Sequence, residues 1–280
     1  MVTNSETAVL DPHVGLGPER MFLGTSALLF AASGIATVFW CRRMTGGMPM
    51  PGGWTMSMAW VRMPGQSLLG TAASFMRMWL VMMIAMMLPS LVPALSIYRL
   101  SIRASDAGID LAWPTAIAGA GYFFTWLVFG AAAYAVGLVL AAAEMRWPIL
   151  ARSVPVVIGV VLLFSGFLQF TEWKTHELAR CRNASACRPS LFPGARNAWQ
   201  HGLRMGVHCT LCCFGFMMIL LAAGVMSLGL MTVVAAAITV ERLAPRPELV
   251  ARATGAAAIA AGVLLVARAC QLLSLSSFDH

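Results

Sequence analysis

The chain has 280 residues, of which 59% are hydrophobic and only 11% are charged, and its formal net charge is +8 at pH 7. Soluble domains carry about 25% charged residues, so this composition excludes a soluble globular protein and makes the lipid bilayer the expected surroundings. The positive charge is then expected to face lipid head groups, and no nucleic-acid partner is predicted.

Residues 1–20 are polar and lack the basic start and apolar core of a secretory signal, so they are expected to form a polar N-terminal tail. Apolar runs follow, each close to the roughly 20 residues that a membrane-spanning helix needs. These runs predict an all-α, polytopic transmembrane helix bundle with about seven spans, within a range of six to eight. The expected spans are 21–40, 78–98, 112–140, 152–171, 203–222, 225–242 and 250–272.

The predicted spans form a single transmembrane domain, 21–272, followed by a C-terminal tail, 273–280. The second span has an alternative, earlier start in LLGTAASFMRMW, and Pro89 and Pro93 are expected to kink it. The apolar run 203–242 is too long for one helix, so GVMSLGL is predicted to be a tight turn between two helices of a hairpin. The distribution of arginines leaves the membrane orientation open.

The segment 41–67 is expected to be a methionine-rich loop between the first two spans. A loop has no core to fill, so packing explains methionines there poorly, although Trp54 and Trp60 suggest a half-buried position at the membrane interface. The methionines of this loop are Met44, Met48, Met50, Met56, Met58 and Met63.

A second group of methionines lies in the stretch MMIAMMLPS of the next span. On a helix, Met82 and Met86 lie in one i, i+4 row, and Met83 and Met87 form a second row beside it. Thioethers are soft ligands that select Cu(I). The alternative interpretation is that methionine supplies adaptable packing for a helix kinked by proline.

The motif HCTLCC is the most specific candidate for a metal site. Met205, Cys209, Cys213 and Met217 share one i, i+4 row of a helix, and His208 and Cys212 lie beside it. Thiolate and imidazole ligands suit Zn²⁺ or copper, and added thioethers favour Cu(I). The competing interpretation is that these cysteines are small buried hydrophobic residues.

The segment 172–202 is expected to be a loop that supplies further ligands, because it leads directly into the helix of HCTLCC. Cys181 and Cys187 have a spacing that suits either a metal chelate or a disulfide, and the sequence leaves both open. Cys41 and Cys270 stand alone at helix ends and are interpreted as inert.

Several of these motifs occur in one order: MWLVMMIAMMLPS, GYFFTWLVFG, GFLQFTEWK, CRNASACRP, GVHCTLCCFGFMM and GVMSLGLM. In this order the chain resembles a bacterial domain-of-unknown-function family described as predicted metal-binding integral membrane proteins, from about residue 44 to 243. Leu168 and Phe214 depart from the Tyr and Trp usual in the family. The residues at the family's motif positions are Gln169, Thr171, Lys174, Cys181, Cys187, Arg188, Pro189, Cys209, Cys212 and Cys213.

The expected function is binding and translocation of a soft transition metal, with copper preferred over zinc, in the bacterial inner membrane. The methionine-rich loop would concentrate the ion, the methionine rows would pass it on, and the cysteines would hold it for a metal chaperone or partner subunit. One alternative is a membrane-embedded, metal-dependent redox enzyme or accessory subunit. Another is an assembly partner with structural disulfides. Catalysis is less expected, because no nucleophile-elbow, phosphate-loop or zinc-protease motif is present.

Overall fold

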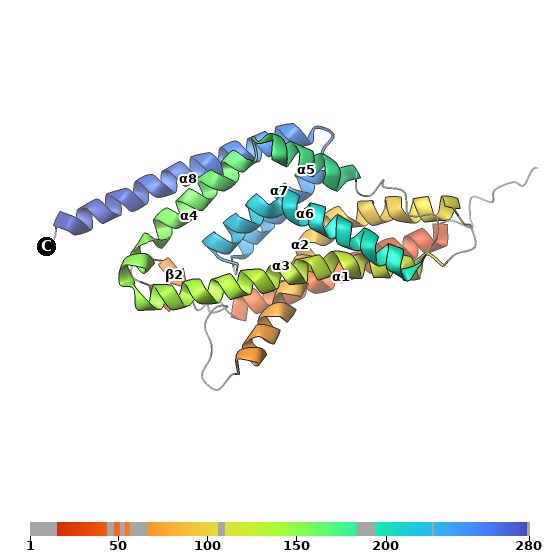
Figure 1. Cartoon of the computed structure of the whole chain (residues 1–280), viewed down its shortest axis with the longest axis horizontal. Helices are drawn as coiled ribbons and strands as arrows, with labels where there is room; N and C mark the ends of the chain where they lie inside the picture. Colours follow the sequence, from red (N-terminus) through yellow and green to blue (C-terminus); the bar gives the residue numbers. More distant parts are fainter. Residues whose placement is uncertain are drawn as a thin grey trace, which may run out of the picture.

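The computed structural model describes residues 16–43, 48–50, 54–56, 67–105, 110–183, 194–225 and 227–278 (Figure 1). Eight helices make up nearly all of this part of the chain, which confirms the predicted all-α bundle. The helices are α1 (Leu16–Arg43), α2 (Leu68–Ser105), α3 (Ala112–Arg146), α4 (Pro148–Leu168), α5 (Glu172–Asn183), α6 (Ala195–Ala223), α7 (Leu228–Leu243) and α8 (Pro247–Phe278).

Six helices of the described residues are long and apolar enough to cross a membrane, as expected for a multi-pass membrane protein: α1, α2, α3, α4, α6 and α8. This number lies within the predicted range of six to eight spans. The segment 225–242 contains α7, which has 16 residues and falls short of the roughly 20 that a bilayer needs. The earlier start of the second span is confirmed, since α2 begins at Leu68.

The predicted hairpin between α6 and α7 is also confirmed. The helix α6 ends at Ala223 and α7 begins at Leu228, with Gly224 between them at φ +118. A side chain at that φ would be strained, so glycine is the residue that allows the chain to turn here.

Two segments that were expected to be loops contain regular structure. In 41–67, β1 (Met48–Met50) pairs antiparallel with β2 (Trp54–Met56), and Met48 lies opposite Met56. Met44, Met58 and Met63 lie outside the described residues. In 172–202, α5 is a helix because its apolar and buried residues recur at helical spacing, which the polar composition of the segment had obscured.

The helix directions follow from close contacts between neighbours. Glu19 lies beside Arg99, and Arg99 lies beside Thr115, so α1, α2 and α3 alternate in direction. The helix α6 runs parallel to α3 because Gly202 faces Ala118 and Gly206 faces Tyr122 one turn further on. A Cβ at Gly202 would overlap the Ala118 carbonyl oxygen, so the glycine allows this approach.

The helices α4 and α8 pack antiparallel along small residues: Gly159 meets Gly262, and Gly166 meets Gly255. Because α4 turns back at the end of α3, α8 runs in the same direction as α3 and α6 (Figure 1). The short α7 therefore returns the chain between α6 and α8. The start of α1 and the end of α8 consequently lie at opposite ends of the bundle.

The core lies around α2 and α6. In the most apolar stretch of each of these two helices, half of the residues are buried. In α1, α3, α4 and α8 the buried share is 17–22%. Trp79, Tyr122 and Trp126 are fully buried, and the Trp79 indole donates a hydrogen bond to the Trp126 carbonyl oxygen at 3.0 Å. The other helices present large apolar side chains to the outside, as lipid contact requires.

Candidate metal centre

The sulfur-bearing row predicted on α6 faces the core. Met205, Cys209, Cys213 and Met217 are all buried, one helical turn apart from each other, and Cys212 is buried beside them. Hydrophobic residues on both sides of the row hold this face of α6 against α3 and α4. The sequence pattern thus locates a single buried strip of sulfur atoms.

Four thiols gather on this strip. The Cys212 and Cys213 Sγ atoms lie 3.6 Å apart, and those of Cys209 and Cys213 lie 3.9 Å apart. Cys181, which α5 carries, is buried beside them, since the Cys209 and Cys212 thiols, together with burial, raise its pKa well above the usual value. We call Cys181, Cys209, Cys212 and Cys213 the thiol cluster. Cys187 lies outside the described residues.

The helix α5 brings Cys181 to the cluster by an amphipathic face. Lys174, Glu177, Leu178 and Cys181 are buried, at the i, i+3, i+4, i+7 spacing that places residues on one side of a helix. The remaining surface of α5 is mostly exposed, including His176. The helix therefore lies with its charged and thiol-bearing face against α6.

Two buried cations border the cluster. The Lys174 Nζ lies 2.5 Å from the Glu241 Oε1 of α7 and donates to the Cys212 carbonyl oxygen, also at 2.5 Å. Arg242 donates from Nη1 to the Cys209 Sγ at 3.4 Å and to the Ser90 Oγ at 2.8 Å. Buried charges of this kind are costly unless they are paired, and here the Lys174–Glu241 ion pair and the hydrogen bonds of Arg242 supply the pairing.

Cys209 has a second donor. The Tyr122 hydroxyl, fully buried on α3, donates to the Cys209 Sγ at 3.0 Å. Arg242 and Tyr122 therefore approach one sulfur from two different helices. This arrangement suits a sulfur that carries negative charge, because hydrogen bonds to an ionised acceptor are the strongest kind.

His208 points to a different partner. Its Nδ1 lies 3.2 Å from the Oε2 of the buried Glu177, whose other oxygen lies 3.1 Å from the Arg180 Nη1. The His208 side chain is 29% exposed, whereas the thiols are buried. His208 thus borders the cluster on its outer side, next to Cys209 in sequence and hydrogen-bonded to α5.

The methionine rows of α2 belong to the same core as the cluster. Met82, Met83, Met86 and Met87 are buried and contiguous with the cysteines in one apolar cluster. Ser90, which donates to the Met87 carbonyl oxygen at 3.0 Å, also accepts the hydrogen bond from Arg242. Arg242 therefore connects the end of the methionine rows to Cys209.

Among the described residues, no group of three or more His, Cys, Asp or Glu side chains has the arrangement of a preformed metal site. The thiols contact one another instead. All six described cysteines are free thiols: Cys41, Cys181, Cys209, Cys212, Cys213 and Cys270.

Tyr122, Ser90 and Arg242 are site neighbours that were not predicted as site residues, although Tyr122 and Ser90 lie in the motifs GYFFTWLVFG and MWLVMMIAMMLPS. Arg242 carried a usable signal, since charged residues at the end of an apolar stretch are costly and usually functional. For Tyr122 and Ser90 the motifs did not indicate a contact with the cysteines, because each reaches the cluster only through packing between helices distant in sequence.

The fold and the cluster define a class: a multi-pass helical membrane protein with buried thiols between its helices. The family model of PpoB2, described as copper chaperone, matches residues 76–265 and includes the whole thiol cluster. The chain belongs to this family. No curated protein and no solved structure matches it. The metal link expected from the resemblance is therefore supported, over a segment that begins later and ends later than predicted.

Proposed function

We propose that this protein binds Cu(I) through the thiol cluster and passes it to a partner, as a copper chaperone embedded in the bacterial inner membrane. The observation that carries the proposal is the convergence of four buried thiols from α5 and α6 in a chain of a copper chaperone family. Free thiols favour metal ligands over structural disulfides. Cys187 is a further candidate ligand.

The spacing of the sulfur atoms suits this role. Metal–sulfur bonds of about 2.3 Å at tetrahedral angles place two sulfurs about 3.8 Å apart. The separations of 3.6 and 3.9 Å on α6 lie close to that value. Small side-chain rotations, rather than helix movement, would therefore open a coordination site. Met205 and Met217 extend the row with soft ligands that favour Cu(I) over Zn²⁺.

The buried charges suit the same cargo. Two thiolates around one Cu(I) carry a net charge of −1. Lys174 and Arg242 together with Glu241 supply a net +1 beside them. A loaded cluster would then be neutral overall, which lowers the cost of holding charge in a low-dielectric interior. His208 is the ligand proposed to bring copper in or out, since it is the partly exposed neighbour of the cluster.

The methionines of α2 are proposed to deliver copper to the thiol cluster from the opposite end of the bundle. The hairpin of β1 and β2 follows the end of α1, whereas α5 follows the end of α4, so they lie at opposite ends of the bundle (Figure 1). Weak thioether sites in series allow an ion to leave each site as readily as it enters. Met86→Leu should slow copper uptake into vesicles and leave tight binding intact, whereas Met76→Leu, outside both rows, should change neither.

Anaerobic purification followed by metal analysis tests the binding site. Protein from copper-fed cells should hold about one copper per chain. The Cys209→Ser/Cys213→Ser variant should lose it, and the matched Cys41→Ser/Cys270→Ser variant should retain it. Equal copper in both variants would contradict the proposed site. Zinc in place of copper would preserve the site and contradict the cargo.

A further inference from the structure

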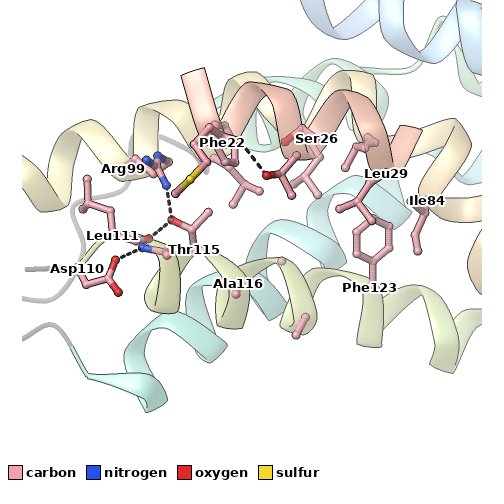
Figure 2. Close-up of a pocket in the computed structure, with 18 of the residues that line it drawn as sticks. Phe22, Ser26, Leu29, Ile84, Arg99, Asp110, Leu111, Thr115, Ala116 and Phe123 are labelled. Carbon is pink, nitrogen blue, oxygen red and sulfur yellow. Dashed lines mark hydrogen bonds between the residues drawn. The ribbon is translucent and has the colours of Figure 1, made fainter. Parts of the chain in front are cut away.

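A cavity of about 590 Å³ lies between α1, α2 and α3 (Figure 2). None of the clustered cysteines lines it. Apolar side chains form most of its walls, including Phe22 and Leu29 from α1, Ile84 from α2 and Phe123 from α3. Its volume falls within the roughly 300–1,000 Å³ of small-molecule sites.

The cavity is long and narrow. Its lining residues on α2 run from Ile84 to Arg103, which is about five helical turns. A volume of about 590 Å³ spread over that length suits an extended chain rather than a compact solute. Because the chain is a multi-pass membrane protein, the nearest extended apolar molecules are the acyl chains of lipids.

One end of the cavity is polar. Arg99 is buried there, 3.4 Å from the Thr115 Oγ1 (Figure 2). Its Nε also lies 3.2 Å from the Glu19 Oε1. Asp110 accepts a hydrogen bond from the Ala112 amide at 2.9 Å. Arg103, one turn beyond Arg99, has no partner among the described residues. It adds a second cation to this end of the cavity.

The side of the cavity opens between α1 and α3. The helix α1 packs along α2 and makes few contacts with α3. Met21 and Leu29, which line the cavity, are 70% and 48% exposed. A Cβ added at Gly119 on the α3 wall would meet nothing within 4 Å. An acyl chain could thus enter sideways from the bilayer.

We propose that this cavity holds one acyl chain of an anionic membrane phospholipid whose phosphate pairs with Arg103. The apolar walls match the chain, and Arg103 at the polar end, where α2 ends and α3 begins, matches the phosphate. Basic pockets between transmembrane helices are known to bind lipid head groups in this way. The site is independent of the proposed copper cluster.

Native mass spectrometry of the purified full chain with added phosphatidylglycerol tests the proposal. The wild-type chain should retain one phosphatidylglycerol after delipidation and re-addition. Gly119→Leu fills the cavity and should abolish retention, and Arg103→Gln should weaken it at least several-fold. The matched Gly34→Leu variant adds the same side chain at a position of α1 that also faces open space but does not line the cavity, and it should behave as wild type.

Equal retention by wild type and Gly119→Leu would overturn the proposal, as would retention of a free fatty acid but not of phosphatidylglycerol. Thermal unfolding is recorded for each variant, and Ala116→Leu, on the same wall, replaces Gly119→Leu if the latter fails to fold. Equal retention by a folded Ala116→Leu would overturn the proposal in the same way.

Discussion

Cys209 is the residue on which most of the candidate site converges. It lies in van der Waals contact with another thiol, and it receives hydrogen bonds from Tyr122 on α3 and Arg242 on α7. Three helices therefore fix the position of one sulfur. Residues that orient a ligand in this way commonly change metal affinity by 10–100-fold when they are replaced.

Tyr122→Phe should weaken Cu(I) affinity by roughly 10-fold, because it removes one donor to Cys209 and keeps the ring. Competition with a Cu(I) chelator measures this affinity. Tyr134→Phe is the matched control, since Tyr134 lies further along α3 and packs on Phe75 instead. Equal affinity in both variants would show that the Tyr122 hydroxyl does not support the ligand.

The buried Lys174–Glu241 pair should have a large effect on the free energy of unfolding when only one partner is removed. Lys174→Met leaves the Glu241 carboxylate buried without its cation, which should cost about 3–5 kcal/mol in the free energy of unfolding. Lys174→Met/Glu241→Met removes both charges and should recover most of that loss. Titration with SDS measures the unfolding of each variant. A double variant as unstable as the single one would show that the unpaired Glu241 carboxylate is not the cause of the loss.

At the scale of the helices, the approach of α6 to α3 sets the position of the cluster. Gly202 and Gly206 place the α6 backbone directly against Ala118 and Tyr122, which brings Cys209 within reach of the Tyr122 hydroxyl. Small residues at such crossings are typical of membrane helices, because they let backbones come close.

Gly202→Ala should therefore destabilise the protein by about 1–3 kcal/mol, since its methyl group would overlap the Ala118 carbonyl oxygen. Gly119→Ala makes the same change on α3 in open space and should not destabilise it. Thermal unfolding in detergent compares the two. If Gly202→Ala were as stable as Gly119→Ala, the close contact between α3 and α6 would be wrong.

Helix periodicity made the sulfur row of α6 and the methionine rows of α2 predictable, because residues four apart share a face whatever the tertiary fold. The helix α5 was missed because its polar composition masks the buried face formed by Lys174, Glu177 and Cys181. The pairing of Lys174 with Glu241 and of Arg242 with Cys209 was not predictable, since each depends on helices far apart in sequence.

At the scale of the whole molecule, the helix directions determine the topology. The helices α1, α3, α6 and α8 run one way, and α2, α4 and the short α7 run the other way. The six long helices alone would leave the two ends of the chain on one side. Because α6 and α8 run in the same direction, α7 must return the chain between them, although it is shorter than a full span. This return places the two ends on opposite sides.

Reporter domains fused before α1 and after α8 should accordingly report opposite sides of the membrane. Paired fusions of alkaline phosphatase and green fluorescent protein at each end measure this, because each is active on only one side. Activity of the same reporter at both ends would mean that α7 does not return the chain across the membrane.

The proposed function requires that the sulfur atoms of the thiol cluster hold the copper. X-ray absorption spectroscopy of the anaerobically copper-loaded protein identifies the ligand atoms. We expect Cu(I) with a shell of sulfur ligands that is lost in Cys209→Ser/Cys213→Ser and kept in Cys41→Ser/Cys270→Ser. A shell dominated by nitrogen or oxygen, or Cu(II) in the loaded protein, would contradict it.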